Sequence, residues 1–392
     1  MSDSVYIVSG ARTPMGGMLG SLSSLTAVEL GTTAIAEAVK RANIDAGKIE
    51  DVIMGCVLPA GLKQGPARQA AIAAGIPKST GAVTVNKLCG SGMQTTIYAH
   101  DQIKAGSCDI IVAGGMESMT NAPHIVLNAR KGVGTGAKGF EDHMFFDGLQ
   151  DAYSGRMMGS FAQQTADDNE FTREQMDAYA IESLNRACAA IKNGSLKAET
   201  APVTVSSRSG ETIVTDDEQP LKASIEKIPT LRPAFAKDGT ITAANASSIS
   251  DGASAMVLMS EKALKETGAT PMARIVAHTR QSLEPALFTT APVGAMQKLL
   301  AKTGWSKDDV DLWEINEAFA MVTMLAIRDL ELDHAKVNVH GGACAQGHPV
   351  GSTGARIIIS LMYALKQYGK KRGIASLCIG GGEALAVAIE LV

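Results

Sequence analysis

The sequence predicts a layered α/β fold built from two copies of one strand–helix unit. Short apolar strands alternate with amphipathic helices over residues 1–120, and the alternation returns after residue 249; this is the pattern of sheets covered by helices. Segments of the first part reappear in the second part at a nearly constant offset. Between the two parts, residues 121–248 lose the regular alternation. We therefore expect two similar halves and an insertion that packs over them.

Three pairs of segments carry the internal similarity, and each pair is separated by roughly 260 to 270 residues. Each match is weak by itself, so the common offset is the observation that indicates duplication. The pairs are Ile7-Val8…Arg12 with Ile275-Val276…Arg280, Ile44 to Ile53 with Trp305 to Trp313, and Gly114-Gly115…Glu117 with Gly381-Gly382-Glu383.

The spacing of apolar residues predicts the elements in order. In the first half we expect strands over 5–10, 49–57, 83–85 and 110–113, and helices over 26–42, 66–74 and 91–105. In the insertion we expect helices over 158–169 and 173–193, the second capped by Thr172 and Gln175, and a hairpin over 203–214. The regular pattern resumes after the insertion with a strand over 254–259, and the second half includes a helix over 353–368. The expected domains are 1–120 with 249–270, the insertion 121–248, and 271–392.

Size and composition exclude several classes of protein. A chain of 392 residues is too long for one compact core. Its 45% hydrophobic and 19% charged residues are typical of a well-buried globular enzyme. A net charge of −4, with no basic run longer than residues 370–372, argues against nucleic-acid binding. No apolar run is long enough to span a membrane, so no membrane partner is expected.

The six cysteines are scattered and show no CxxC and no His/Cys ligand spacing. Neither a zinc site nor a disulfide framework is therefore indicated, and free thiols favour a reducing compartment. The first strand begins at Val5, which leaves no room for a signal peptide, and the last residues do not form a peroxisomal signal. We expect a cytoplasmic protein.

Cys89 is the first candidate for chemistry. It stands between the apolar strand that ends at Val85 and the helix that begins at Ser91, with Gly90 beside it. N–H groups at a helix N-terminus favour a thiolate, which is the nucleophilic form of cysteine. A lone cysteine in such a turn is nevertheless more often a small buried hydrophobic residue. The rest of the chain must therefore decide its role.

Two segments of the second half supply groups that would complete a site. His348 lies between Gly347 and Pro349, in a loop that leaves its ring free to point outward, and Cys378 leaves an apolar strand into three glycines. If the halves pack face to face, His348 can take the proton of Cys89. Cys378 can act as a general acid or base, and the N–H groups of the loop 378–382 can form an oxyanion hole.

At this point the chain resembles the thiolase family over essentially its whole length. Four motifs carry the resemblance, and their common order and spacing make it specific. They are Leu88-Cys89-Gly90-Ser91-Gly92, Asn316-Glu317-Ala318-Phe319-Ala320, Gly347-His348-Pro349 and Cys378-Ile379-Gly380-Gly381-Gly382. The resemblance implies a duplicated thiolase-like fold with layers in the order α/β/α/β/α, and an inserted loop domain for coenzyme A (CoA) binding and oligomer contacts.

The resemblance also implies a role for each site residue. Cys89 is acylated after activation by His348, and Cys378 exchanges a proton with the α-carbon of the second acyl-CoA. Asn316 positions a water that, with His348, binds the enolate-like oxygen, and the N–H groups of Cys89 and Gly380 bind the oxyanion. The substrate-binding residues implied are Ser247, Phe235, Ala318, Phe319, Met158, Leu231, Ala243, Phe288, Lys222 and Lys227.

Some of these positions depart from the short-chain family pattern. Met157-Met158-Gly159 stands where short-chain members commonly have His-Met-Gly, and Phe288 stands where they often have methionine. Lys222 and Lys227 are the nearest candidates for the CoA phosphates, and solvated surface lysines are an equally good interpretation of them.

The implied activity is that of an acetyl-CoA C-acetyltransferase, which condenses two acetyl-CoA reversibly into acetoacetyl-CoA and CoA. No metal or redox cofactor is expected, and CoA is a substrate and product of the reaction and not a cofactor. The resemblance also implies a homo-oligomer, a dimer of dimers. Three alternatives stay open: a 3-ketoacyl-CoA thiolase for longer chains, a ketoacyl synthase, which would use Cys-His-His, and a non-catalytic acyl-CoA or lipid carrier.

Overall fold

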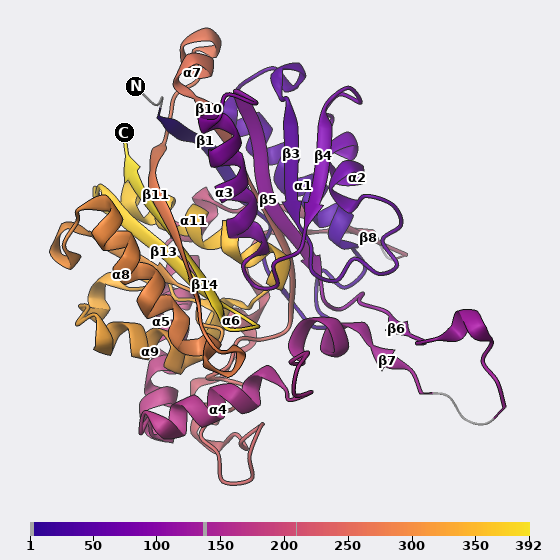
Figure 1. Ribbon diagram of the computed structural model, residues 1–392, viewed down its shortest axis with the longest axis vertical. Coiled ribbons are helices and arrows are strands. Elements are labelled where there is room, and N and C mark those ends of the chain that lie inside the picture. Colours follow the sequence, from indigo (N-terminus) through magenta and orange to yellow (C-terminus); the bar gives the residue numbers. More distant parts are fainter. Residues whose placement is uncertain (1–3, 136–138, 209) are drawn as a thin grey trace.

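The computed structural model, which describes residues 4–135, 139–208 and 210–392, has five stacked layers (Figure 1). One core lies between the two halves of the sheet around two central helices, and two further cores lie under the outer helices. The predicted fold class, a duplicated α/β/α/β/α arrangement, is confirmed. Within the described residues, no helix is long and apolar enough to cross a membrane.

The first half of the sheet has the strand order β4–β3–β5–β10–β1. β3, β4 and β5 are parallel to one another, whereas β10 is antiparallel to both β5 and β1. Its strands are β1 (Val5–Arg12), β3 (Asp51–Gly55), β4 (Gly81–Val85), β5 (Ile110–Ser118) and β10 (Ser250–Ser260), with the short β2 (Gly16–Gly17) paired to β10.

The second half repeats this topology in the order β12–β13–β14–β11. β12 and β13 are parallel, and β14 is antiparallel to β13 and β11. The two halves meet where β1 pairs with β11 over three residue pairs. The strands are β11 (Ala273–Ser282), β12 (Leu312–Ile315), β13 (Arg372–Ile379) and β14 (Glu383–Leu391).

The two halves share the same irregularity in strand pairing at matching residues. β1 shifts its pairing register between Ile7 and Ser9, and β11 shifts between Ile275 and Ala277. These are the segments that the sequence comparison matched. The second match is also confirmed, because a short helical turn precedes β3 as another precedes β12.

The third match is wrong. Gly114 and Gly115 lie inside β5, whereas Gly381 and Gly382 form a turn after β13 with φ angles of +87° and +91°. A Cβ atom on Gly115 would lie 1.9 Å from the carbonyl oxygen of Gly351. These β5 glycines therefore serve close packing inside a strand and do not end it.

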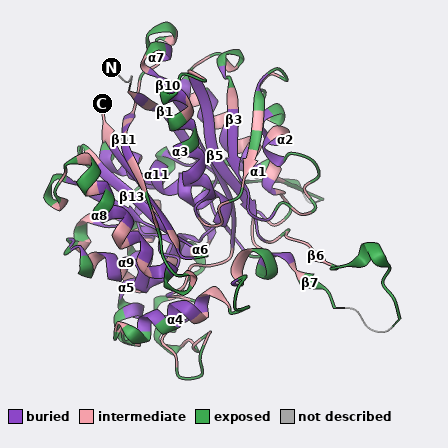
Figure 2. Ribbon diagram, viewed as in Figure 1, coloured by how far each residue is buried: buried purple, intermediate pink, exposed green. Residues whose placement is uncertain are grey.

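Helices α3 (Ser91–Lys104) and α11 (Val350–Gln367) form the central layer and pack on each other (Figure 1). Nearly every side chain of α11 is buried, as expected of a helix that is covered on all sides. The outer helices are α1 (Ala27–Ala42), α2 (Pro66–Ala73), α8 (Ala291–Thr303) and α9 (Ala320–Asp329), and α7 (Glu261–Thr267) lies at the periphery. Figure 2 shows the buried residues concentrated in the sheet and the central helices.

The insertion covers one end of the layers. It contains α4 (Met158–Asp168), α5 (Arg173–Lys192), α6 (Glu218–Lys222) and the hairpin of β8 (Val203–Ser207) and β9 (Gly210–Val214). The predicted capping box of Thr172 and Gln175 is present at the start of α5. β6 (His124–Ile125) and β7 (Glu141–Asp142) pair in an arm that projects from the body (Figure 1).

Most boundaries agree with the predicted ranges, and the exceptions have local causes. α11 begins at Val350, three residues before the predicted start, because Pro349 takes the N-cap position and cannot continue a helix backwards. β3 is shorter than predicted because Asp45 caps a helical turn at Ala46–Lys48, just before the strand.

Candidate active site

A cavity of about 480 Å³ lies where the N-terminus of α3 meets loops of the second half and of the insertion. The predicted site residues that line it come from all three parts of the chain. They are Cys89, Met158, Phe235, Ala243, Ser247, Phe288, Ala318, Phe319, His348 and Gly380. The structure thus brings together residues that are up to 291 positions apart, Cys89 and Gly380.

The turn that carries Cys89 is held in a strained conformation. Leu88 has a φ of +49°, in the left-handed region that non-glycine residues rarely adopt. The N–H of Leu88 donates to the side chain of Asn86 (2.9 Å), and its carbonyl accepts from the hydroxyl of Ser91 (2.7 Å). These bonds fix the turn and therefore the direction of the Cys89 side chain.

Cys89 is partly buried at the cavity surface, and two backbone N–H groups lie close to its sulfur. Burial raises its pKa to about 11, although the N–H groups of Gly380 and of Cys89 itself interact with the sulfur and act in the opposite direction. The backbone N–H groups favour the thiolate, as expected, but desolvation outweighs them, so the thiol is the resting form. The same two N–H groups are those that the resemblance assigns to the oxyanion hole.

His348 lines the same cavity as Cys89 and has a free ring nitrogen. Its Nδ1 lies 2.6 Å from the Thr353 hydroxyl, which itself donates to the Pro349 carbonyl (3.0 Å). The hydroxyl has one proton, so Nδ1 must be the donor of the first bond and Nε2 carries the lone pair. Nε2 has no partner among the described residues. The arrangement leaves Nε2 ready to accept a proton.

The electrostatic environment keeps His348 neutral. Burial, with a smaller contribution from the cation of Arg356, lowers its pKa to about 3. Cys89 and His348 thus rest as a thiol and a neutral imidazole and not as an ion pair. We infer that the proton moves only when the sulfur forms its new bond.

Cys378 and Asn316 lie just behind the cavity surface. Cys378 is fully buried, and burial together with the neighbouring Cys89 raises its pKa well above the ordinary value. Asn316 is 1% exposed, and its side-chain nitrogen and oxygen have no partner among the described residues. A buried amide of this kind is normally satisfied by ordered water, which agrees with the water-positioning role that the resemblance implies.

Two buried carboxylates that were not predicted hold the loops in place. Glu117, at the end of β5, accepts hydrogen bonds from the N–H groups of Val57 (2.9 Å), Leu58 (3.1 Å) and Gly351 (2.9 Å). It therefore ties the start of α11, next to His348, to the first half. Its position after an apolar strand was visible in the sequence, but its remote partners were not.

Glu317 holds the Asn316 loop in the same way. Its carboxylate accepts from the hydroxyls of Tyr179 (2.9 Å) and Ser183 (2.7 Å), and from the side chain of Asn338 (2.8 Å). Because α5 supplies two of these donors, the insertion positions the loop as well as covering it.

Aromatic rings close the acyl end of the cavity. Phe235 and Phe319 meet edge to face with their centroids 6.3 Å apart, and Phe288 is 3% exposed in the same wall. A Cβ on Gly159 would lie 2.2 Å from the Phe235 ring, so the ring occupies this place only because residue 159 is glycine. The positions of these rings in the cavity wall therefore depend on the glycine at 159 and on the packing of Phe235 against Phe319.

The remaining predicted residues lie outside this cavity. Leu231 and Lys227 line an adjoining hollow of about 220 Å³, which shares Ala243 and Ser248 with the main cavity. Lys222 forms an ion pair with Glu218 and faces a different depression. For Lys222, the interpretation as a surface lysine fits the structure better than a contact to CoA.

The depressed pKa of His348 predicts a pH-dependent stability. Between the native pKa of about 3 and the ordinary value of 6.5, the unfolded chain binds the proton and the native protein does not, so stability falls as pH falls below about 6.5. Urea unfolding at pH 7 and at pH 5 measures the free energy of unfolding at each pH. Between these two pH values, this free energy should fall by about 2 kcal/mol less in His348→Gln than in the natural protein. The same loss in both proteins would contradict the burial of a neutral His348.

Comparisons with known proteins agree with this geometry. Residues 5–262 match the family model described as "Thiolase, N-terminal domain" and residues 269–391 match "Thiolase, C-terminal domain". The chain is 48% identical to acetyl-CoA acetyltransferase 2 of Arabidopsis thaliana (99% of this chain, 97% of the relative), and 43% identical to acetyl-CoA acetyltransferase of Allochromatium vinosum over all of both chains.

Two solved structures are also similar over nearly the whole length. The Acat5 thiolase of Ascaris suum in complex with coenzyme A has a TM-score of 0.94 and 44% identity, covering 99% of this chain and 100% of the other. The acetyl-CoA acetyltransferase of Bacillus anthracis has a TM-score of 0.97 and 39% identity, covering 100% and 99%.

Proposed function

The chain belongs to the thiolase family, and from this we propose that it is an acetyl-CoA C-acetyltransferase, which joins two acetyl-CoA reversibly into acetoacetyl-CoA and CoA. One observation carries the proposal. A cysteine, a histidine with a free Nε2 and a glycine N–H meet in one cavity whose far end is closed by aromatic rings.

In the first half-reaction Cys89 takes the acetyl group. Its sulfur attacks the thioester carbon while Nε2 of His348 accepts the thiol proton, and the oxyanion binds the N–H groups of Cys89 and Gly380. The carbon–sulfur bond to CoA then breaks, and the departing thiolate takes a proton from Cys378. Acetyl-Cys89, a protonated His348 and a Cys378 thiolate remain.

In the second half-reaction the Cys378 thiolate removes a proton from the methyl group of a second acetyl-CoA. His348 and a water held by Asn316 stabilise the enolate oxygen. The enolate carbon attacks the acetyl-Cys89 carbonyl, the bond to Cys89 breaks, and His348 returns its proton to the sulfur. Protons balance over the cycle, because each group that gains one gives one up.

The CoA portion would extend away from Cys89 along the insertion. Ser247 lines the main cavity, and the adjoining hollow with Leu231 and Lys227 continues from Ala243. We propose that the pantetheine arm follows this path, and that the insertion also supplies the contacts of a homo-oligomer, a dimer of dimers, in the cytoplasm.

The aromatic wall predicts a preference for the shortest 3-ketoacyl substrate. We expect the natural protein to cleave acetoacetyl-CoA with a higher kcat/KM than a long-chain 3-ketoacyl-CoA. Phe288→Ala should raise kcat/KM for the longer substrate by about tenfold, because removing a buried ring opens the space that extra methylene groups need. Steady-state cleavage assays over a series of acyl lengths measure both effects.

Leu287→Ala is the matched control, because Leu287 is the preceding residue, 44% exposed, and does not line the cavity. It should leave the chain-length profile unchanged. A natural protein that strongly prefers the longer substrate would instead be a 3-ketoacyl-CoA thiolase of broader range. Among the described residues that line the cavity, His348 is the one histidine, which disfavours the Cys-His-His site of a ketoacyl synthase.

A further inference from the structure

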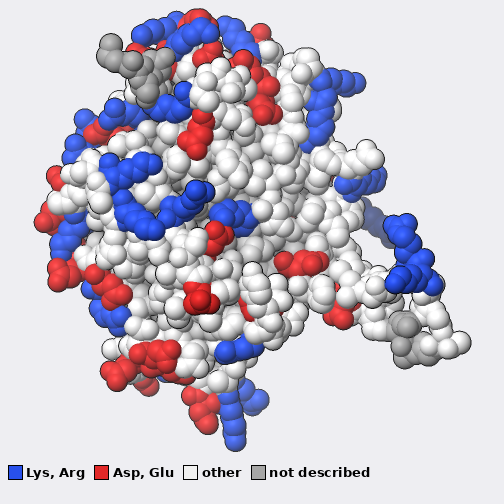
Figure 3. All heavy atoms as spheres, viewed as in Figure 1, with Lys and Arg blue, Asp and Glu red and all other residues white. Residues whose placement is uncertain are grey.

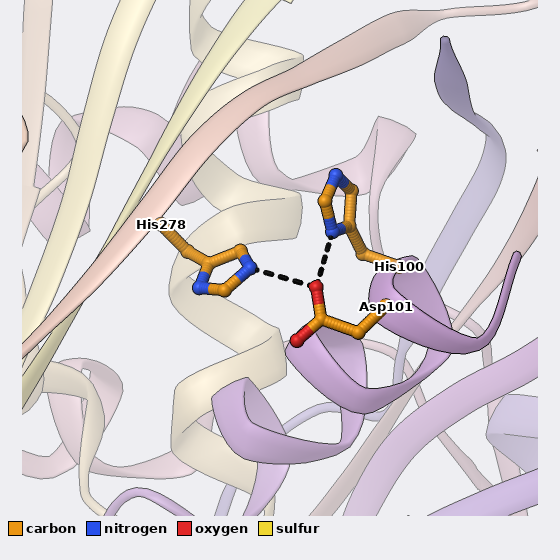
Figure 4. Close-up of side chains that lie close together, drawn as sticks. All are labelled: His100, Asp101 and His278. Carbon is orange, nitrogen blue, oxygen red and sulfur yellow. Dashed lines mark hydrogen bonds and ion pairs between the residues drawn. The ribbon is translucent and has the colours of Figure 1, made fainter. Parts of the chain in front are cut away.

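A second cluster of side chains lies on the seam between the two halves, away from the cavity. His100 and Asp101 stand on α3 and His278 on β11, and all three point toward one another (Figure 4). Oδ1 of Asp101 lies 2.8 Å from Nδ1 of His100 and 2.9 Å from Nε2 of His278. The cluster shares no residue with the lining of the cavity.

The three ligand atoms are of the kinds that a divalent transition metal ion binds, and they already lie close together. Two imidazole nitrogens and one carboxylate oxygen lie within 4.8 Å of one another, and this donor set suits zinc. A tetrahedral ion about 2.0–2.2 Å from each ligand separates the ligand atoms by about 3.3 Å. The cluster must therefore open by about half an ångström, which the Asp101 side chain, 54% exposed, can accommodate.

Asp101 and His278 form one wall of a pocket of about 370 Å³, and the other wall is basic. Arg280, Lys298 and Lys302 line that wall. Figure 3 shows basic side chains gathered on the left of the molecule, the side on which Figure 1 places α8 and β11. The Lys302 ammonium donates to the His278 carbonyl at 3.0 Å, so it is directed at the backbone of β11. These charges will weaken the binding of a cation, and we therefore expect an exchangeable site and not a permanent structural one.

We propose that His100, Asp101 and His278 form a binding site for a divalent transition metal ion, with Zn²⁺ as the expected ligand, and that the bound ion clamps α3 of the first half to β11 of the second. The three protein ligands leave a fourth position for water or a small anion from the adjoining pocket. No local sequence pattern indicates this site, because 177 residues separate Asp101 from His278.

The test is a calorimetric titration of the metal-free full-length protein with ZnCl₂. His278→Gln removes an imidazole ligand, and Asp101→Asn removes the charge of the carboxylate, while both keep a hydrogen-bonding side chain. Each variant should bind zinc at least about tenfold more weakly than the natural protein. His124→Gln is the matched control, because His124 is an exposed histidine on β6, outside the cluster. It should bind zinc as the natural protein does.

Titration with Co²⁺ separates this site from the cysteines. We expect visible ligand-field absorption without sulfur-to-cobalt charge transfer, and both site variants should lose this absorption. Zinc should raise the unfolding midpoint of the natural protein and of His124→Gln, but not that of either site variant. Three results would each overturn it: no zinc binding, equal affinity in either site variant, or cobalt bound through sulfur.

Discussion

Replacing Cys89 with serine is expected to lower kcat for acetoacetyl-CoA formation by at least about 10³-fold. Serine has nearly the same volume, so the strained turn at Leu88 should be retained. Its hydroxyl, however, is a far weaker acid than a thiol, and His348, with a pKa of about 3, is too weak a base to deprotonate it. Release of CoA from acetyl-CoA, followed under steady-state conditions, measures the loss.

Cys108→Ser is the matched control for this substitution. Cys108 is a partly buried free cysteine between α3 and β5 and is not part of the cavity lining, so its replacement should leave kcat within twofold. A Cys89→Ser protein that condensed acetyl-CoA at near the natural rate would show that the sulfur of Cys89 does not carry the acetyl group.

Replacing Cys378 with alanine should separate the two half-reactions. Condensation is expected to fall by at least about 10³-fold, because the proposed mechanism relies on the Cys378 thiolate to remove a proton from the methyl carbon. Acetyl transfer to Cys89 should continue, since a CoA thiolate can depart without a proton. Exchange of labelled CoA into acetyl-CoA reports the first step, and acetoacetyl-CoA formation reports the second.

Loss of exchange and condensation together would show that the CoA thiolate cannot depart without the proton of Cys378. A normal condensation rate would show that Cys378 takes no part in the proton transfers. The alanine side chain leaves only a small void at a fully buried position. Thermal unfolding of the variant therefore serves as the check that its fold is intact.

Much of this site was predictable because the chemistry lies in short local motifs. The turn at Cys89, the loop at His348 and the glycines after Cys378 are each contiguous in the sequence. The matched register shifts near Val8 and Val276 show that the duplication was also visible in local patterns. Local sequence patterns therefore predict those parts of the structure that are formed by residues close to one another in the chain.

The properties that sequence reasoning missed depend on distant neighbours. The protonation of Cys89 is set by burial under parts of the chain that no local pattern describes. The carboxylate of Glu117 is satisfied by N–H groups up to 234 residues away, and Gly115 is required by the backbone of Gly351. Desolvation and close packing follow from the assembled fold, so single segments could not reveal them.

The central claim is that Cys89 carries the acetyl group, and mass spectrometry after rapid mixing with acetyl-CoA tests it most directly. The natural protein and Cys378→Ala should each gain one acetyl group, which peptide mapping should place on Cys89, and Cys89→Ser should gain none on this time scale. No acetyl adduct in the natural protein would favour a non-catalytic acyl-CoA carrier, and an adduct on a different residue would contradict the assignment of the nucleophile.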